Sequence, residues 1–250
     1  MNRLLIVGAC GRMGRLLAGM APKHGFEPAC GVDRGDPTYF AFPVYPDFSR
    51  VDLPCDLLID FSAPEMLPGL LAYAVQHRVP CVLGTTGYTE RDLDAIRLAA
   101  GSIPVFHSPN MSRGIYVLRQ LAARARALLP GFDIEIIEKH HSQKQDSPSG
   151  TALALLDAVK TPGDRAVFGR EGKQTRRQDH EIGVHALRGG TVAGDHEVGF
   201  YGDHEVITLA HHAQDRGVFA AGALYAAAWL LGKEPGLYGM EDVMGEGLGE

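Results

Sequence analysis

The feature that most constrains this chain is a glycine-rich turn directly after an apolar segment at its N-terminus. The residues LLIVG at 4–8 have the composition of a short buried strand, and GACGRMG follows at 8–14. Apolar residues with helical spacing continue through 14–24. Glycines at such a point allow a tight turn and a close approach of the backbone to an anion at the helix N-terminus. This order of strand, turn and helix predicts a dinucleotide-binding unit of the Rossmann type.

Further apolar segments continue the pattern after the first helix. They read as strands at 26–33, 57–62, 79–87 and 103–110. Strands that alternate with helices predict a parallel sheet with right-handed crossovers. Ser62 and Glu65 have the spacing of a capping box for the next helix, and Thr89 is placed to cap the helix after that.

The pattern changes after about residue 112. We expect helices at 113–128, 151–160 and 217–231, with an alternating strand FDIEIIEKHH between the first two. The polar residues 161–180 are interpreted as a loop, and strands are expected from 181 onward in IGVHALRGG, TVAGDHEVGFYG and HEVITLAHHA. Their alternation predicts a largely antiparallel or mixed sheet. The fold class expected is therefore α/β, an N-terminal Rossmann-type parallel sheet plus an α+β domain with a mixed sheet.

Composition excludes several classes of function. The net charge of −6 argues against non-specific binding of DNA or RNA. No apolar run approaches the roughly 20 residues of a membrane helix, and a short stretch broken by a glycine turn is a poor secretion signal. We therefore expect a cytoplasmic protein with no membrane partner.

The cysteines show no CxxC or zinc spacing and are expected to be reduced, buried side chains. They are Cys10, Cys30, Cys55 and Cys81.

Several residues around the glycine turn are candidates for contact with the cofactor. Asp33 ends the second strand and is placed to bind adenosine ribose hydroxyls, which favours NAD. Arg34 follows directly and is placed to pair with a 2′-phosphate, which favours NADP, so the choice between NADH and NADPH stays open. Arg12 is expected near the adenine or the phosphate. The ends of the fourth and fifth strands add Gly84, Thr85, Thr86, Ser108, Pro109, Asn110 and Met111.

The segment EKHHSQKQDSPSGTA at 138–152 carries the most chemistry. Histidine exchanges a proton near neutral pH, and Lys144 supplies a cation. The Ser149-Gly150-Thr151 turn opens a helix and offers backbone N–H groups and hydroxyls to a carboxylate. These residues predict a site for a small anion whose reaction needs a proton. Metal binding is not expected, because adjacent histidines on a strand point to opposite faces.

At this point the sequence resembles a known family, the dihydrodipicolinate (4-hydroxy-tetrahydrodipicolinate) reductases of the diaminopimelate route to lysine. The similar motifs are VGACGRMG, DFSAPE, LGTTG, SPNMSRG and EKHHSQKQDSPSGTA, followed by IGVHALRGGTVAGDHEVGF and HHAQDRGVFAAGALYAAAWL. The resemblance covers nearly the whole chain. It implies a dinucleotide-binding domain at 1–110, a substrate-binding and oligomerisation domain at 111–216, and a C-terminal segment at 217–250 that returns to the first domain. It also implies a homotetramer built through the substrate-domain sheets.

The resemblance also implies roles for individual residues. The phosphate turn is Gly8, Ala9, Cys10, Gly11, Arg12 and Met13. His140 becomes the proton donor and acceptor, and Lys144 a second proton donor. His141, Gly150 and Thr151 bind the substrate, a small dicarboxylate, and the turn adds Ser149.

Two alternatives stay open beside this reading. One is a different Rossmann reductase of a small dicarboxylate, of the aspartate or inositol dehydrogenase type, which the HHxxK and SGT pattern disfavours. The other is a regulatory module that binds NAD(P) without turnover, which His140, Lys144 and Thr151 disfavour.

Overall fold

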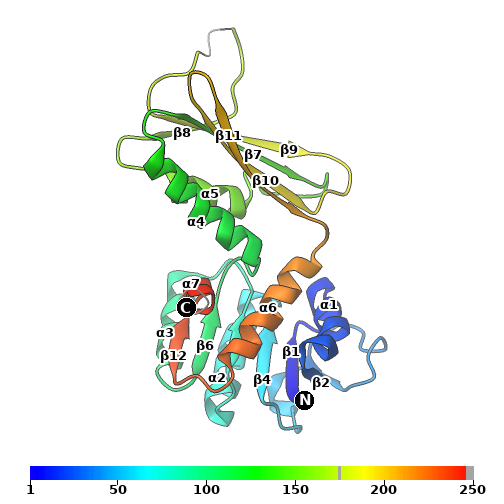
Figure 1. Ribbon diagram of the computed structural model, residues 1–250. Coiled ribbons are helices and arrows are strands. Elements are labelled where there is room, and N and C mark those ends of the chain that lie inside the picture. The colour runs from blue at the N-terminus through cyan, green and yellow to red at the C-terminus, as the bar shows by residue number, and fades with distance from the viewer. Residues whose placement is uncertain (174–175, 246–250) are drawn as a thin grey trace. The chain divides into compact units, whose positions relative to one another are not determined.

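The protein is described here by a computed structural model that covers residues 1–173 and 176–245. Its described residues form two compact units, one of residues 1–112 with 217–245 and the other within Arg113–Arg216. Both units are drawn in Figure 1. The predicted loop at 161–180 and the predicted segment at 217–250 each include positions outside the described residues. Among the helices of the described residues, none combines the length and the apolar composition that a membrane span requires.

The first unit is built on a parallel sheet of seven strands in the order β12-β6-β5-β4-β1-β2-β3. The strands are β1 Asn2–Val7, β2 Phe26–Val32, β3 Val44–Tyr45, β4 Leu57–Asp60, β5 Cys81–Leu83, β6 Pro104–His107 and β12 Gly236–Tyr238. Residues 4–7 of β1 are fully buried, as expected for a strand covered by helices on both faces. The parallel order brings the carboxyl ends of β1, β4, β5 and β6 to one edge of the sheet.

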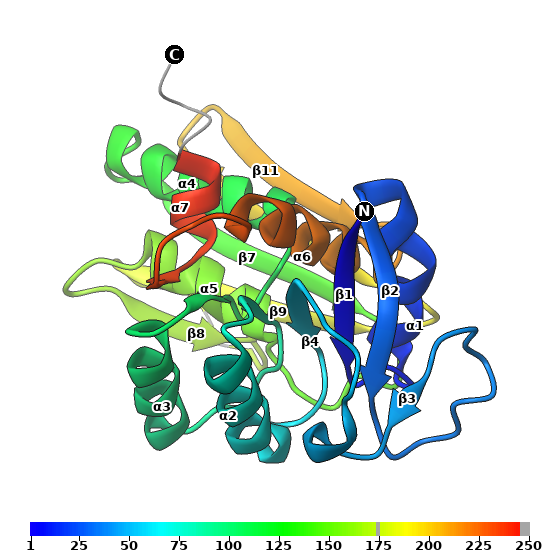
Figure 2. The ribbon, with the colours of Figure 1, turned by 90° about the horizontal axis from the view of Figure 1, so that it is seen from below.

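The helices of the first unit cover both faces of this sheet. They are α1 Arg12–Met20, α2 Leu67–His77, α3 Glu90–Ala100, α6 Gly217–Leu230 and α7 Met240–Gly245, with 3-10 turns at Ala21–His24, Phe48–Arg50 and Pro64–Met66. Helix α6 packs against α1 and against β4, β5 and β6, and α2 packs against α3. Figure 2 shows β4 lying between α6 and α2. A buried cluster of aliphatic side chains from the strands and from α2 and α3 forms the core.

The second unit is a mixed sheet of five strands in the order β11-β10-β7-β9-β8. The strands are β7 Asp133–His140, β8 Arg165–Phe168, β9 Glu181–Arg188, β10 Gly194–Tyr201 and β11 Val206–Ala213. β10 pairs antiparallel with β7 and β11, whereas β9 pairs parallel with β7 and β8. Helices α4 Arg113–Leu128 and α5 Gly150–Val159 pack against each other and against the sheet. Their core includes Ile134, Ile136 and Val198.

The expected fold class is confirmed, and some local predictions are wrong. Residues 165–168 form β8 where a loop was expected, and β3, β12 and α7 were not predicted. Thr89 does cap α3, in a capping box with Asp92. The box expected at Ser62 does not form, because Ser62 donates its hydroxyl to Asp60 and the next turn begins at Ala63. All four cysteines are free, but only Cys30 and Cys81 are buried, and Cys10 and Cys55 are partly exposed.

Candidate active site

The glycine turn between β1 and α1 has the close packing that its sequence predicts. Gly8 has a positive φ of 77°, and a Cβ there would lie 2.7 Å from the carbonyl oxygen of Phe61. At Gly14 a Cβ would lie 2.3 Å from the carbonyl oxygen of Gly8 and 2.4 Å from that of Ala9. Only glycine lets α1 pack this closely on the turn that precedes it.

The N-terminus of α1 is suited to an anion. Gly11 is its cap, no side chain caps it, and its first turn holds no acidic residue. The first N–H groups of a helix have no acceptor within the helix and carry its positive partial charge. Arg12, the first residue of α1, is exposed, and Met13 is partly buried. These features fit the phosphates of a dinucleotide, because the first turn of α1 offers backbone N–H groups and holds no carboxylate of its own.

Asp33 connects the end of β2 to this turn. Its carboxylate accepts hydrogen bonds from the N–H of Cys10 at 2.9 Å and from the N–H of Gly35 at 2.8 Å. A carboxylate has about four acceptor sites, so these two bonds leave capacity for ribose hydroxyls. Arg34 beside it is exposed. The cofactor choice was predicted to depend on the Asp33 carboxylate and the Arg34 guanidinium, and both groups are present at the end of β2.

At the carboxyl end of β5, the predicted residues divide into supporting and exposed ones. The Thr85 side chain is buried, and its Oγ1 accepts the N–H of Ser62 at 2.9 Å. Gly84 lies against the Phe61 ring, where a Cβ would come within 2.6 Å. Thr86 is exposed. Thr85 therefore supports the edge of the sheet, and Thr86 is the threonine that a bound molecule can reach.

A buried carboxylate at this edge was not among the predicted site residues. Asp60 ends β4 and is 1% exposed, and it accepts hydrogen bonds from Ser62 and from the Tyr88 hydroxyl at 3.1 Å. Burial raises the pKa of Asp60, and these hydrogen bonds only partly oppose that rise. The available sequence signal was an aspartate that ends the apolar segment LLID.

The residues after β6 form a compact turn. Ser108 donates its hydroxyl to the carbonyl of Asn110 at 2.8 Å, and Asn110 accepts the N–H of Ser112 through its side chain at 2.9 Å. Pro109 is exposed. Met111 is 1% exposed and packs under α6, where a Cβ on Gly222 would lie 1.7 Å from the carbonyl oxygen of Met111. The Met111 side chain therefore belongs to the core.

In the second unit, His140 ends β7 beside a fully buried carboxylate. Its Nδ1 lies 2.5 Å from Oε2 of Glu138, which is 0% exposed. Arg188 of β9 donates to both oxygens of Glu138, each at 2.8 Å. Burial lowers the pKa of His140 and outweighs the opposing effect of Glu138. Burial raises the pKa of Glu138, but the bonds from Arg188, His140 and Ser149 outweigh it, and the net shift is downward.

The Ser-Gly-Thr turn begins α5 as predicted, but its serine is committed to the protein. Ser149 caps α5 by accepting the N–H of Ala152 at 3.1 Å, and its own N–H donates to Glu138 at 2.9 Å. The Ser149 hydroxyl also lies 3.1 Å from Nε2 of His196. Gly150 is exposed and Thr151 is partly exposed. Ser149 therefore supports the turn, and Gly150 and Thr151 are the members that an anion can reach.

Basic side chains lie close to His140 and His141, which precede this turn in the chain. The Lys144 ammonium lies 2.8 Å from the Asp146 carboxylate, and the Lys144 side chain is 21% exposed. His141, adjacent to His140 on the chain, has its Nε2 3.4 Å from Nη2 of Arg216. Arg216 was not predicted, because it lies 75 residues from His141 along the chain.

His196 is a second residue of this region that the sequence did not predict. It packs edge-on against His140 with ring centroids 5.1 Å apart, and burial lowers its pKa to about 4.

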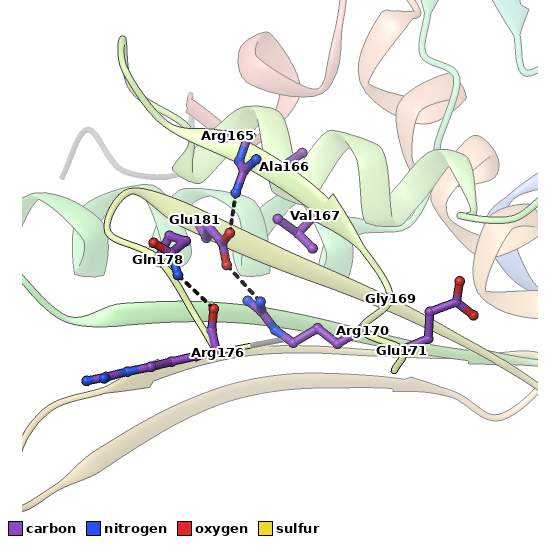
Figure 3. Close-up of a pocket in the computed structure, with 9 residues that line it drawn as sticks. All are labelled: Arg165, Ala166, Val167, Gly169, Arg170, Glu171, Arg176, Gln178 and Glu181. Atoms are coloured by element: carbon purple, nitrogen blue, oxygen red, sulfur yellow. Dashed lines mark hydrogen bonds and ion pairs between the residues drawn. The ribbon is translucent and has the colours of Figure 1, made fainter. Parts of the chain in front are cut away.

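A polar pocket of about 510 Å³ lies elsewhere in the second unit, between β8, β9 and the segment that joins them. Figure 3 shows Arg165 and Arg170 directed at the Glu181 carboxylate inside it. Hydrogen bonds from Arg170 lower the pKa of Glu181 to about 2. None of the predicted site residues lines this pocket. Two of its three guanidinium groups, those of Arg165 and Arg170, are already paired with Glu181, so we assign no ligand to the pocket. In the described part of the chain, no group of three or more His, Cys, Asp or Glu residues is arranged to hold a metal ion.

Comparison with known proteins places this geometry in a family. A model of the dihydrodipicolinate reductase N-terminus matches residues 2–111, and a model of the dihydrodipicolinate reductase C-terminus matches residues 114–244. The chain belongs to the dihydrodipicolinate reductase family. It is thus an oxidoreductase of a pyridine-nucleotide-dependent family, and the predictions of the family and of the enzyme class are confirmed.

Individual members of the family are similar over the full chain. The 4-hydroxy-tetrahydrodipicolinate reductase of Caldanaerobacter subterraneus subsp. tengcongensis is 47% identical, with 99% of this chain and 100% of that protein covered. The enzyme of the same name from Methanoregula boonei is 40% identical, with 98% of each chain covered. Among solved structures, a dipicolinate-bound dihydrodipicolinate reductase from Paenisporosarcina sp. TG-14 has a TM-score of 0.80 at 24% identity, and 97% of this chain and 99% of that chain are covered. At this identity the structural match supports the fold alone.

Proposed function

We propose that this protein reduces 4-hydroxy-tetrahydrodipicolinate to tetrahydrodipicolinate with NADH or NADPH. The observation that carries the proposal is the cluster at the end of β7 and the start of α5. There a histidine suited to proton exchange, a lysine and the N-terminus of α5 lie in one unit of a reductase of this family. The first turn of α5 holds no acidic residue that would repel an anion. The full-length relatives that carry this enzyme name support the substrate.

The cofactor is assigned to the first unit. Its adenosine ribose would contact Asp33 and Arg34. Its phosphates would be held by the glycine turn, that is by Gly8, Ala9, Cys10, Gly11, Arg12 and Met13. Thr86 and the turn of Ser108, Pro109 and Asn110 would contact its nicotinamide half, and Gly84, Thr85 and Met111 support these segments. When bound, the reduced nicotinamide supplies the hydride that this reaction needs.

The substrate dicarboxylate is assigned to the second unit. A carboxylate is an acceptor for the first N–H groups of α5 at Gly150 and Thr151 and for the Thr151 hydroxyl. The other carboxylate would meet positive charge or hydrogen-bond donors from Lys144, His141 and Arg216. Ser149 contributes indirectly, because it caps α5 and fixes where that helix begins.

The proposed reaction removes water from the substrate and adds a hydride at ring C4 and a proton at the adjacent carbon. His140 is the proton donor in this proposal, and Lys144 is a second donor. The lowered pKa of His140 means that most molecules carry a neutral imidazole at neutral pH, so the rate of protonation should rise as the pH falls.

We also propose a cytoplasmic location and a homotetramer that assembles through the open faces of the five-stranded sheets. Leu187 and Val206 support the assembly, because they are 48% and 55% exposed on strands of that sheet. Light scattering coupled to size exclusion tests it. A mass of four chains is expected, and a monomer at micromolar concentration would contradict it.

Steady-state kinetics with both cofactors and freshly generated substrate test the proposed activity. Wild-type protein should consume reduced nicotinamide only when substrate is present. His140→Ala and Lys144→Ala should each lower kcat by about 10²–10⁴-fold with little change in cofactor affinity. Cofactor binding without substrate-dependent oxidation would instead favour a sensing module, and faster oxidation with another dicarboxylate would favour a different reductase.

A further inference from the structure

The Glu138 carboxylate has a complete set of partners inside the second unit. Its Oε1 accepts from Nη2 of Arg188 at 2.8 Å and from the N–H of Ser149 at 2.9 Å. Its Oε2 accepts from Nη1 of Arg188 at 2.8 Å and contacts Nδ1 of His140 at 2.5 Å. The two parallel bonds from Arg188 compensate the negative charge and fix the plane of the carboxylate. Glu138 is thus an ionised group held at a single position.

This contact decides which nitrogen of His140 carries the proton. An ionised carboxylate only accepts hydrogen bonds, so Nδ1 must be the donor and the neutral ring has its lone pair on Nε2. In the described part of the chain, no residue forms a hydrogen bond with that Nε2. A Cβ on Gly194 would lie 3.1 Å from it, so the glycine at the start of β10 leaves room beside this nitrogen.

We infer that Glu138 is a positioning residue for His140, which holds the ring in the Nδ1–H tautomer so that Nε2 exchanges the proton with the substrate. This inference rests on the proposed role of His140 in the reduction. The same carboxylate accepts the N–H of Ser149, the cap of α5. One buried group therefore sets both the orientation of the proton donor and the place where the substrate-binding turn begins.

The charged and titratable groups around His140 come from three strands and one loop. Glu138 lies on its own strand, Arg188 on β9, His196 on β10, and Lys144 in the loop after β7. Lys144 and Arg188 disfavour the imidazolium, and Glu138 favours it. Removal of the Glu138 charge would leave the two cations unopposed and lower the pKa of His140 further. The pH at which kcat falls, as His140 loses its proton, should then move to a lower value.

The tautomer of His140 can be measured in the wild-type protein. In imidazole-¹⁵N-labelled protein above the pKa of His140, Nδ1 should have the shift of a protonated nitrogen and Nε2 that of a bare one. The signals are assigned by their loss in His140→Ala. A bare Nδ1 and a protonated Nε2 in the wild type would overturn the inference without any variant at position 138.

Glu138→Gln tests the role in turnover. Its amide oxygen can replace Oε1 for Ser149 and for Nη2 of Arg188. The NH₂ group then replaces Oε2, so the bond from Nη1 of Arg188 is lost, and its position against Nδ1 of His140 favours the opposite tautomer. We expect kcat to fall roughly 10–10³-fold at neutral pH, the kcat–pH profile to move to lower pH, and the ¹⁵N pattern to reverse. The double variant Glu138→Gln/His140→Ala should be no slower than His140→Ala alone, because the two residues act as a unit.

Glu135→Gln is the matched control. Glu135 also lies on β7, contacts a histidine at 2.8 Å, and is paired with Arg170 and Arg177. Its substitution should leave the pH profile unchanged. If His140→Ala is slow but Glu138→Gln keeps wild-type kcat and tautomer, the inference fails and the proposed function stands. If His140→Ala itself is fully active, the assignment of the proton donor fails.

Discussion

At the scale of single residues, Thr151 is the most direct test of the carboxylate site. Thr151→Val removes one hydroxyl and nearly keeps the side-chain shape. The loss of a hydrogen bond to a charged group costs about 1.5–3 kcal/mol, or about 10- to 150-fold in kcat/KM. The loss should appear mainly in the KM for substrate, and Thr151→Ser, which keeps the hydroxyl, should recover most of it. An unchanged KM in the valine variant would place the carboxylate elsewhere.

Cofactor choice is also decided by single residues. The Asp33 carboxylate favours an unmodified ribose, whereas the exposed Arg34 guanidinium favours a 2′-phosphate. We expect dual use, with a preference below about a hundredfold, which is under ~2.7 kcal/mol. Arg34→Ala should raise the KM for NADPH more than that for NADH, and the difference should shrink at high salt because the contact is exposed. Asp33→Ala should weaken NADH more.

The control for Arg34→Ala is Arg91→Ala, which removes an exposed charge of the same unit from α3. It should not alter the ratio of the two KM values. Equal weakening of both cofactors by Arg34→Ala would show that Arg34 does not recognise the 2′-phosphate.

The sequence supports residue predictions only where the chemistry is local. The Thr89 cap of α3 and the start of α5 at the Ser149-Gly150-Thr151 turn follow from short spacings and are present. Glu138 and Arg216 were missed as site residues because their roles depend on partners brought together by the sheet. Arg188, for example, lies 50 positions from Glu138, and their contact requires the parallel pairing of β7 with β9.

At the scale of elements, helix α1 allows a matched comparison of two glycines. Gly14→Ala would place a Cβ within 2.4 Å of two carbonyl oxygens of the glycine turn. The helix must then move away from the turn, so cofactor affinity should fall at least tenfold and stability should fall as well.

Gly19→Ala is the control, because no atom lies within 4 Å of a Cβ there. It should raise stability by about 0.4–1 kcal/mol and leave cofactor affinity unchanged. Cofactor titration and urea unfolding measure both effects. Equal behaviour of the two variants would contradict the close packing of α1 on the turn.

Elements with strong apolar patterns were predicted well, and short edge elements were not. β1 is a continuous apolar run, β7 has an alternating pattern and α4 has helical spacing, and all three elements are present in the fold. β8 and β12 are edge strands of four and three residues, and their pairing with β9 and β6 depends on register between distant segments. A short strand at the edge of a sheet carries little periodicity, so tertiary pairing decides it.

At the scale of the whole molecule, buried histidines predict how stability depends on pH. Burial lowers the pKa of His107 in the first unit and of His140 and His196 in the second. Below the ordinary value of about 6.5 the unfolded chain therefore binds more protons than the native one, and stability is lost as the pH falls towards about 4. His196 alone should account for about 2 kcal/mol between pH 7 and pH 5.

Urea unfolding at pH 7 and pH 5, followed by circular dichroism, checks this expectation. His196→Gln should reduce the difference between the two pH values. Glu138 should contribute little in this window, because its pKa is lowered and its protonation requires a lower pH. Equal stability at the two pH values would contradict the burial of these imidazoles in neutral form.

The central claim for the whole molecule is that this chain transfers a hydride to 4-hydroxy-tetrahydrodipicolinate. The most direct measurement uses NADH or NADPH that carries deuterium at the transferring C4 position, with mass spectrometry of the product. We predict tetrahydrodipicolinate with one deuterium per molecule, formed in proportion to the cofactor oxidised. In the same reaction time, His140→Ala should form nearly no product. Product without deuterium, or cofactor bound and never oxidised in the presence of fresh substrate, would contradict the account.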